Sequence, residues 1–202
     1  MDKSAMHKIG YGLYILTAKD GDKDNGCVIN TVMQITGSPL IIAIGVNKQN
    51  YTHDMIAKTG VFNISVLTTE TPFKVFEHFG FQSGKDINKF EACETIVRSE
   101  NGLLYLPKYI NAYISGKVIN TVDFNTHTLF ISEVTDAKAI SKLETLSYEY
   151  YQKNVKPKPQ PKETAKIGYR CNICGYEYIG DPLPDDFICP ICKHGAADFT
   201  KM

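Results

Sequence analysis

Four cysteines near the C-terminal end of the chain have the spacing of a metal site. They form two Cys-x-x-Cys pairs separated by fourteen residues: Cys171, Cys174, Cys189 and Cys192. Four thiolates brought together in this way make a tetrahedral sulfur cage that suits zinc or iron. Spacing alone favours a structural zinc ribbon. Two disulfides are an alternative to a metal, but they would need an oxidising compartment. The polar N-terminal residues show no signal-peptide pattern that would direct the chain to such a compartment.

The residues around the two pairs shift the interpretation toward iron. Gly175 follows the first pair and can take a positive φ, which turns backbone N–H groups toward the sulfurs. Such hydrogen bonds tune the reduction potential of an iron–sulfur centre. Pro190 stiffens the second pair. The segment is too small to form an ordinary apolar core. Its aromatic residues would supply a core instead: Tyr169, Tyr176, Phe187 and Phe199.

The same segment resembles rubredoxin. The resemblance rests on Tyr-x-Cys-x-x-Cys-Gly-Tyr at residues 169–176 and on Leu-Pro-Asp-Asp-Phe-Ile-Cys-Pro-Ile-Cys at residues 183–192. The loop between the pairs is shorter than in free rubredoxins and closer to the rubredoxin-like tail of rubrerythrins. Phe187 stands where rubredoxins usually carry Trp. Neither departure changes a ligand, so the resemblance implies one iron (Fe2+/Fe3+) held by the four cysteine thiolates.

Length and composition indicate a globular chain with two parts. The 202 residues are enough for one domain of ordinary size plus a small module. Lys+Arg and Asp+Glu both number 22, so the balanced charge gives no sign of a nucleic-acid partner. No apolar run approaches the length of a membrane span. We therefore expect a soluble protein with neither nucleic acid nor a membrane as its partner.

A linker is expected between the two parts. Residues 152–166 contain five lysines and three prolines, Pro157, Pro159 and Pro161. The prolines exclude a helix and favour an extended chain. This places one domain at residues 1–151 and the other at residues 167–202. The composition fits a tether that swings the metal module between partners and a passive spacer equally well.

The first 151 residues are expected to be mainly β. Polar residues 19–25 are expected to form a turn, residues 37–39 a break, and residues 51–59 a helix that starts after Asn50 and stops at Gly60. Residues 144–153 are expected to form a terminal helix. Many strands and few helices favour a closed antiparallel barrel. Apolar or alternating runs predict strands at residues 12–18, 27–33, 40–46, 61–67, 110–122 and 129–134.

The strand-to-helix junction at residues 47–52 could bind an anion. A helix N-terminus offers free N–H groups and partial positive charge, which suit a phosphate. Lys48 and the Thr52 hydroxyl would add donors. A capped helix without a ligand is the more common meaning of this pattern. Two other nucleotide motifs fail: the glycines at 10–12 lack the third glycine of a dinucleotide fingerprint, and residues 80–86 fall short of a P-loop.

The order of several short segments resembles the flavin reductase family. The segments are Gly26-Cys-Val-Ile-Asn-Thr-Val-Met-Gln-Ile-Thr, Asn47-Lys48 with Thr52, Thr59-Gly-Val-Phe-Asn, Ser83-Gly-Lys-Asp with Lys89-Phe90, and His127-Thr-Leu-Phe-Ile-Ser-Glu-Val. Members of this family are FMN-binding split barrels that act as homodimers. The resemblance covers nearly all of residues 1–151. It implies a mainly β, Greek-key split barrel that carries FMN.

The family resemblance assigns roles to individual residues. Asn30, Thr31, Met33 and Gln34 would line the flavin ring or ribityl chain, and Asn47, Lys48 and Thr52 would hold the phosphate. Ser83, Gly84 and Lys89 would lie near the flavin, some of them from the partner subunit. His127 matches the family histidine near the nicotinamide. In this sequence Asn125-Thr126 replaces the Gly-Asp that often precedes the family histidine, so direct use of NAD(P)H stays open. The alternative role for His127 is a hydrogen-bonded histidine in a turn.

The tandem arrangement resembles the high-molecular-weight rubredoxins. A flavin exchanges two electrons or one, whereas a single iron exchanges only one, so their fusion converts between the two kinds of transfer. The resemblance implies a cytoplasmic electron carrier that takes electrons from NAD(P)H or a reductase. The implied acceptor is a flavodiiron protein that reduces NO or O2. Two alternatives remain: an NAD(P)H:flavin oxidoreductase that supplies reduced flavin, and a flavin-binding protein with a structural zinc ribbon.

Overall fold

The structure is a computed structural model that describes residues 1–91, 97–157 and 168–202. The chain divides into two compact units, Met1–Pro157 and Lys158–Met202. The expected linker is described only as far as Pro157, because residues 158–166 lie outside the described residues.

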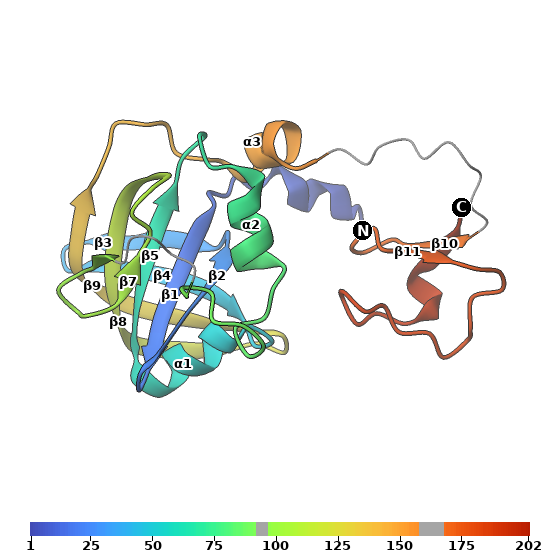
Figure 1. The fold of residues 1–202 in the computed structure, drawn as a ribbon, viewed down its shortest axis with the longest axis horizontal. Helices are drawn as coiled ribbons and strands as arrows, with labels where there is room; N and C mark the ends of the chain where they lie inside the picture. Colours follow the sequence, from blue (N-terminus) through green and yellow to red (C-terminus); the bar gives the residue numbers. More distant parts are fainter. Residues whose placement is uncertain (92–96, 158–167) are drawn as a thin grey trace. The chain divides into compact units, whose positions relative to one another are not determined.

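The first unit is built on a seven-stranded antiparallel sheet that curves into a split barrel (Figure 1). The mainly β fold predicted from the sequence is confirmed. The strand order is β2-β1-β5-β8-β9-β4-β3. The strands are β1 (Tyr14–Asp20), β2 (Lys23–Ile29), β3 (Val32–Gly37), β4 (Leu40–Asn47), β5 (Val61–Leu67), β8 (Ile110–Asp123) and β9 (His127–Ala139).

The helices of this unit are short. In Figure 1, α1 lies at the lower end of the barrel, where it packs against β1 and β2, and α2 also packs against β2. None of the helices in the described residues is long and apolar enough to cross a membrane. The elements outside the main sheet are η1 (Lys3–Lys8), α1 (Tyr51–Thr59), α2 (Phe73–Gly80), the hairpin β6 (Val97–Arg98) and β7 (Leu104–Tyr105), α3 (Tyr148–Tyr150) and the π-helical turn η2 (Tyr151–Val155).

Two apolar clusters fill this unit. The barrel interior contains side chains with at most 1% of their surface exposed, including Leu16, Ile44, Phe62, Ile64 and Phe130. The second cluster joins the sheet to α2 and the C-terminal turn, and includes Leu67, Phe76, Phe79, Leu146 and Tyr151. The first cluster includes residues of α1 and the second includes residues of α2, so both helices are packed against the sheet.

The predicted polar turn at residues 19–25 is wrong in its extent. Only Gly21 and Asp22 lie between β1 and β2, and Gly21 has the positive φ of 56° that the turn requires. Lys19 and Asp20 end β1, and residues 23–25 begin β2, where two of them have distant partners. Asp24 pairs with Arg98 at 2.7 Å, and the Asn25 amide donates to Thr52 Oγ1 at 2.9 Å. The predicted break at residues 37–39 and the helix at 51–59 are confirmed.

The predicted terminal helix begins too early. Thr145 and Ser147 form antiparallel bridges with Thr68 and Gly12, so residues 144–147 follow the sheet edge and the helix starts at Tyr148. The sequence-based prediction also missed α2. Phe73, Phe76 and Phe79 have the spacing of one helix face, and this pattern would have revealed it.

The second unit is a small sheet with one helical turn. Its strands, in the order β11-β10-β12, are β10 (Gly168–Cys171), β11 (Glu177–Ile179) and β12 (Phe199–Lys201), and η3 (Ala196–Asp198) leads into β12. Both pairings are antiparallel. This sheet places the first cysteine pair at the end of β10, and the bridge between Ile188 and Gly195 closes the loop that carries the second pair.

Candidate functional site

The four cysteines of the second unit converge on one point. Their Sγ atoms all lie within 4.8 Å of one another. Cys171 and Cys192 are 3.5 Å apart, as are Cys174 and Cys189. Four sulfurs at these separations surround a space that fits one tetrahedral metal ion. Cys171 and Cys189 are buried, whereas Cys174 is exposed and Cys192 is partly exposed.

Each pair ends in a backbone turn that exposes N–H groups to sulfur. Gly175 and Lys193 follow the second cysteine of their pairs, with φ values of 79° and 60°. The prediction for Gly175 is confirmed, while Lys193 adopts the same conformation without the freedom of glycine. Burial raises the pKa of the Cys189 thiol, but hydrogen bonds from the N–H groups of Cys192 and Ile191 and from the thiols of Cys192 and Cys174 together lower that pKa to about 6. Burial raises the pKa of Cys174, and that of Cys192 to about 12, so within this group of thiols the negative charge is favoured on Cys189.

Phe187 is the centre of the aromatic support behind the sulfurs. Its ring centroid lies 4.8 Å from that of Tyr178, 5.4 Å from Phe199 and 6.4 Å from Tyr176. The first two contacts are edge-to-face and the third is stacked. Together these rings replace the apolar core that so short a unit cannot build otherwise.

Phe187→Ala is expected to loosen the metal module without removing a ligand. Loss of the half-buried ring should cost about 2 kcal/mol, less than a fully buried phenylalanine. If the metal leaves through local opening of the module, a chelator should then strip it about 30-fold faster. Phe187→Trp is the matched control, because it keeps an aromatic ring. Equal stripping rates for wild type and Phe187→Ala would contradict the assigned role.

In the barrel, three predicted residues meet beside the start of α1. Asn47 ends β4 and is the cross-strand partner of His127 at the start of β9. Lys48 follows, and its backbone N–H donates to Thr126 O at 3.0 Å. His127 Nδ1 lies 2.9 Å from Thr126 Oγ1. The sequence resemblance gave Asn47 and Lys48 to the phosphate and His127 to the nicotinamide, and the structure places all three at one end of the barrel.

Thr52 lies in the first turn of α1 but faces inward. Its side chain has no exposed surface, and its hydroxyl accepts a hydrogen bond from Asn25 Nδ2 at 2.9 Å. The hydroxyl therefore fixes α1 to β2 in this structure. Near the helix start, Asn47 Oδ1 accepts from Gln49 N at 2.9 Å, and Asn50 forms no side-chain cap. Within the first turn, the backbone N–H of His53 donates to Asn50 O at 2.9 Å.

Asn30 and Thr31 form the bend between β2 and β3. Thr31 Oγ1 donates to Gly45 O at 2.6 Å, which holds the bend against β4 two residues before Asn47. Met33 and Gln34 follow on β3, with Met33 59% exposed. Gln34 Nε2 donates to Thr36 O at 3.3 Å. These four predicted residues thus lie along one rim of the barrel.

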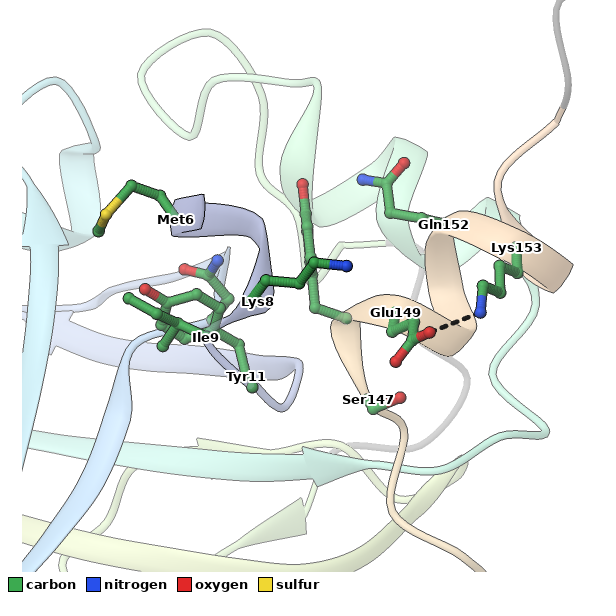
Figure 2. A pocket seen from close by; sticks show the side chains of 11 residues that line it. Met6, Lys8, Ile9, Tyr11, Ser147, Glu149, Gln152 and Lys153 are labelled. Atoms are coloured by element: carbon green, nitrogen blue, oxygen red, sulfur yellow. Dashed lines mark hydrogen bonds and ion pairs between the residues drawn. The ribbon is translucent and has the colours of Figure 1, made fainter. Parts of the chain in front are cut away.

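A cavity of about 770 Å³ opens beside Asn30. Figure 2 shows Met6, Ile9 and Tyr11 on one side, Glu149, Gln152 and Lys153 on the other, and Lys8 between them. Lys153 pairs with Glu149 at 2.5 Å. Tyr11 and Tyr148 add aromatic surface to the lining. The volume and the mixed lining suit a planar aromatic ligand with polar edges, and none of these residues except Asn30 was predicted as part of a site.

Ser83, Gly84 and Lys89 belong to the segment after α2. Gly84 is buried against the side chain of Asn25, and Ser83 Oγ accepts from Lys85 N at 3.1 Å. Lys89 is 3% exposed, and its ammonium donates to Gly26 O at 2.8 Å and Phe79 O at 2.9 Å. Burial lowers the pKa of Lys89. In this structure Lys89 therefore fastens the segment to β2.

Four polar residues near Lys48 were missed by sequence reasoning: His53, Asp54, Asp123 and Thr128. They come from α1, β8 and β9, and Asp123 forms an ion pair with Lys48. Only the fold brings these elements together, so no local pattern could have identified the group.

The fold and the two sites define a flavin reductase-type barrel joined to a rubredoxin-type iron module. The family model described as "Flavin reductase like domain" matches residues 6–158, and the one described as "Rubrerythrin, rubredoxin-like domain" matches residues 169–200. The chain is 40% identical to the High molecular weight rubredoxin of Moorella thermoacetica, with all of both chains covered. It belongs to the high-molecular-weight rubredoxin family.

Other relatives match the barrel alone. The Ferric-chelate reductase (NAD(P)H) of Archaeoglobus fulgidus is 38% identical over 75% of this chain and 89% of its own length. The solved structure of the NADH:FAD oxidoreductase SgcE6 of Streptomyces globisporus has a TM-score of 0.64 at 20% identity, and covers 71% of this chain and 84% of its own. The expected cofactors, FMN and one iron bound by four cysteines, agree with these family matches and with the sulfur cluster.

Proposed function

We propose that this chain transfers electrons from a two-electron donor to a one-electron acceptor, using FMN in the barrel and iron in the C-terminal module. The flavin supplies two-electron and one-electron chemistry, and the iron supplies one-electron chemistry. The observation that carries the proposal is the convergence of four sulfurs in a chain whose other unit is a flavin reductase-type barrel. The protein then provides binding, orientation and access.

The iron module offers an exit for electrons on one face. Cys174 is exposed, and the isoleucines that flank the cysteines are unusually so for apolar residues: Ile173 is 48%, Ile188 60% and Ile191 63% exposed. An exposed apolar collar favours brief docking of a partner. We infer that the acceptor meets the iron beside Cys174, the exposed ligand.

The barrel residues would hold FMN along one line. The phosphate would lie at the N-terminus of α1 against Lys48, where free N–H groups favour an anion. The ring would lie toward Asn30 and the adjoining cavity, with Thr31, Met33 and Gln34 along the rim. His127, beside Asn47, would contact the reductant. Ser83, Gly84 and Lys89 would support the flavin from the segment after α2.

A second copy of the chain would complete the flavin site. Exposed apolar side chains lie on β3 and on the hairpin from β8 to β9, with Met33 59%, Ile35 48%, Ile119 55% and Phe124 55% exposed. β3 is also an edge strand of the sheet. A homodimer formed through the split barrel would bury these apolar side chains and cover the edge strand.

The donor would be NAD(P)H or a separate reductase, and the acceptor a flavodiiron protein that reduces NO or O2. The donor proposal is supported by the similarity to the Ferric-chelate reductase (NAD(P)H). The acceptor proposal rests on the whole-length similarity to a high-molecular-weight rubredoxin. Four free thiols that must load iron suit a reducing compartment such as the cytoplasm.

Stopped-flow mixing with NADH or NADPH tests this electron path. The flavin absorbance should fall first and the iron absorbance should follow at a linked rate. The matched control is the same protein stripped of flavin, in which the nicotinamide should no longer reduce iron. Iron reduction at an unchanged rate without flavin would overturn the proposal.

The match to the flavin reductase-like family model also favours a second function, an NAD(P)H:flavin oxidoreductase that releases reduced flavin. Retention of FMN through gel filtration separates the two functions. A carrier keeps its flavin, whereas a supplier of free flavin loses it at each turnover.

A further inference from the structure

The cation proposed to bind the FMN phosphate already has an anionic partner. Lys48 Nζ lies 2.7 Å from Asp123 Oδ1 and 2.9 Å from Oδ2, so both carboxylate oxygens contact it. The backbone of the same lysine is held by Thr126 O at 3.0 Å. The Lys48 side chain is 34% exposed and that of Asp123 is 72% exposed. The pair therefore faces solvent at the place where a phosphate would arrive.

A chain of polar contacts fixes the carboxylate from its other side. Thr128 Oγ1 donates to Asp123 Oδ1 at 3.3 Å and lies 2.9 Å from His53 Nε2. His53 Nδ1 lies 3.1 Å from Asp54 Oδ1. His53 and Asp54 belong to the first turn and a half of α1. This arrangement holds Asp123 near the positive end of the helix, where an anion is stabilised.

Asp123 thus fills the role that the ligand phosphate would fill, as an anion between Lys48 and the start of α1. The hydrogen bond from Lys48 holds the pKa of Asp123 below its usual range, so the carboxylate stays charged at neutral pH. A phosphate must either displace this carboxylate from Lys48 or bind beside a like charge. Both routes weaken phosphate binding.

We propose that Asp123 competes with the FMN phosphate for Lys48 and thereby sets the affinity for phosphorylated flavin. The inference rests on the proposed phosphate site. A flavin without a phosphate leaves the ion pair intact, so Asp123 weakens FMN binding and leaves riboflavin binding unchanged. Asp123 therefore affects specificity, because it reduces the difference in binding affinity between FMN and riboflavin.

Asp123→Asn tests the competition because it removes the charge and keeps the shape. We expect the Kd for FMN of the flavin-free full-length chain to fall about fivefold, the scale of an exposed ion pair, with no change for riboflavin. Fluorescence quenching of each flavin measures both constants. The matched control is Asp20→Asn, which breaks the 2.7 Å pair with Lys58 at the other end of α1 and should change neither constant.

Three other outcomes would overturn the inference. The first two leave the proposed phosphate site in place, and the third removes that site as well. Weaker or unchanged FMN binding in Asp123→Asn would show that the carboxylate positions Lys48 or is neutral. An equal gain in riboflavin affinity would show that Asp123 acts on binding of the flavin ring and not of the phosphate. If wild type binds FMN no better than riboflavin and Lys48→Met changes neither, the proposed phosphate site itself is wrong. Circular dichroism confirms that each variant is folded.

Discussion

Cys189→Ser is expected to abolish iron binding and electron delivery to a one-electron acceptor while FMN stays bound. Cys189 is fully buried, and its sulfur is one of four within 4.8 Å of one another. A serine hydroxyl stays protonated at neutral pH and is a poor ligand for iron at a site that otherwise holds thiolates. Because structural metal binding is coupled to folding in so small a unit, its loss should also unfold the module.

The measurement combines iron analysis, the visible spectrum and reduction of an added acceptor. Iron should fall from one per chain to nearly none, and the acceptor rate should fall at least about 100-fold, which corresponds to about 2.7 kcal/mol of activation free energy. FMN content should equal that of wild type, because the flavin residues belong to the other unit. Cys27→Ser is the control, since Cys27 is a buried thiol in the barrel and outside the cluster. Wild-type delivery by Cys189→Ser would disprove the electron path.

The metal site could be predicted from sequence because its determinants are local. Each Cys-x-x-Cys pair fixes two ligands within one turn, and Gly175 marks the bend that follows. The aromatic residues also lie within the same short segment. Lys193 could not be predicted in the same way, because a lysine gives no sign that its φ will be 60°. Its conformation is imposed by the second pair.

The barrel site was less predictable because its contacts join distant parts of the chain. Asn25 looked like part of a turn, yet its amide bonds Thr52 across 27 residues. Asp123 had no local pattern at all, and its partner Lys48 lies 75 residues away. Resemblance to a family placed residues around the site, but the ion pair and the inward turn of Thr52 required the fold.

Gly84→Ala is expected to destabilise the barrel and weaken FMN binding together. A Cβ on Gly84 would overlap Oδ1 and Cγ of Asn25 and lie 2.7 Å from Nδ2. Asn25 is 2% exposed and is held by its hydrogen bond to Thr52, so it has no room to retreat. Either this bond breaks or the segment around Ser83 lifts away from the barrel. Overpacking of this kind should cost about 3 kcal/mol of unfolding free energy.

Urea unfolding and FMN titration check the Gly84 prediction, and a double-mutant cycle tests its cause. The Kd for FMN should rise about tenfold as Ser83 moves away from the proposed flavin site. Asn25→Ala by itself lowers the unfolding free energy, but it also removes the atoms that a Cβ on Gly84 would overlap. The double variant should therefore lose less unfolding free energy than the sum of the two single losses. Gly37→Ala is the control, because its Cβ would meet only Gln34 Nε2, at 3.9 Å. Additive losses would mean that Asn25 does not limit the position of Gly84.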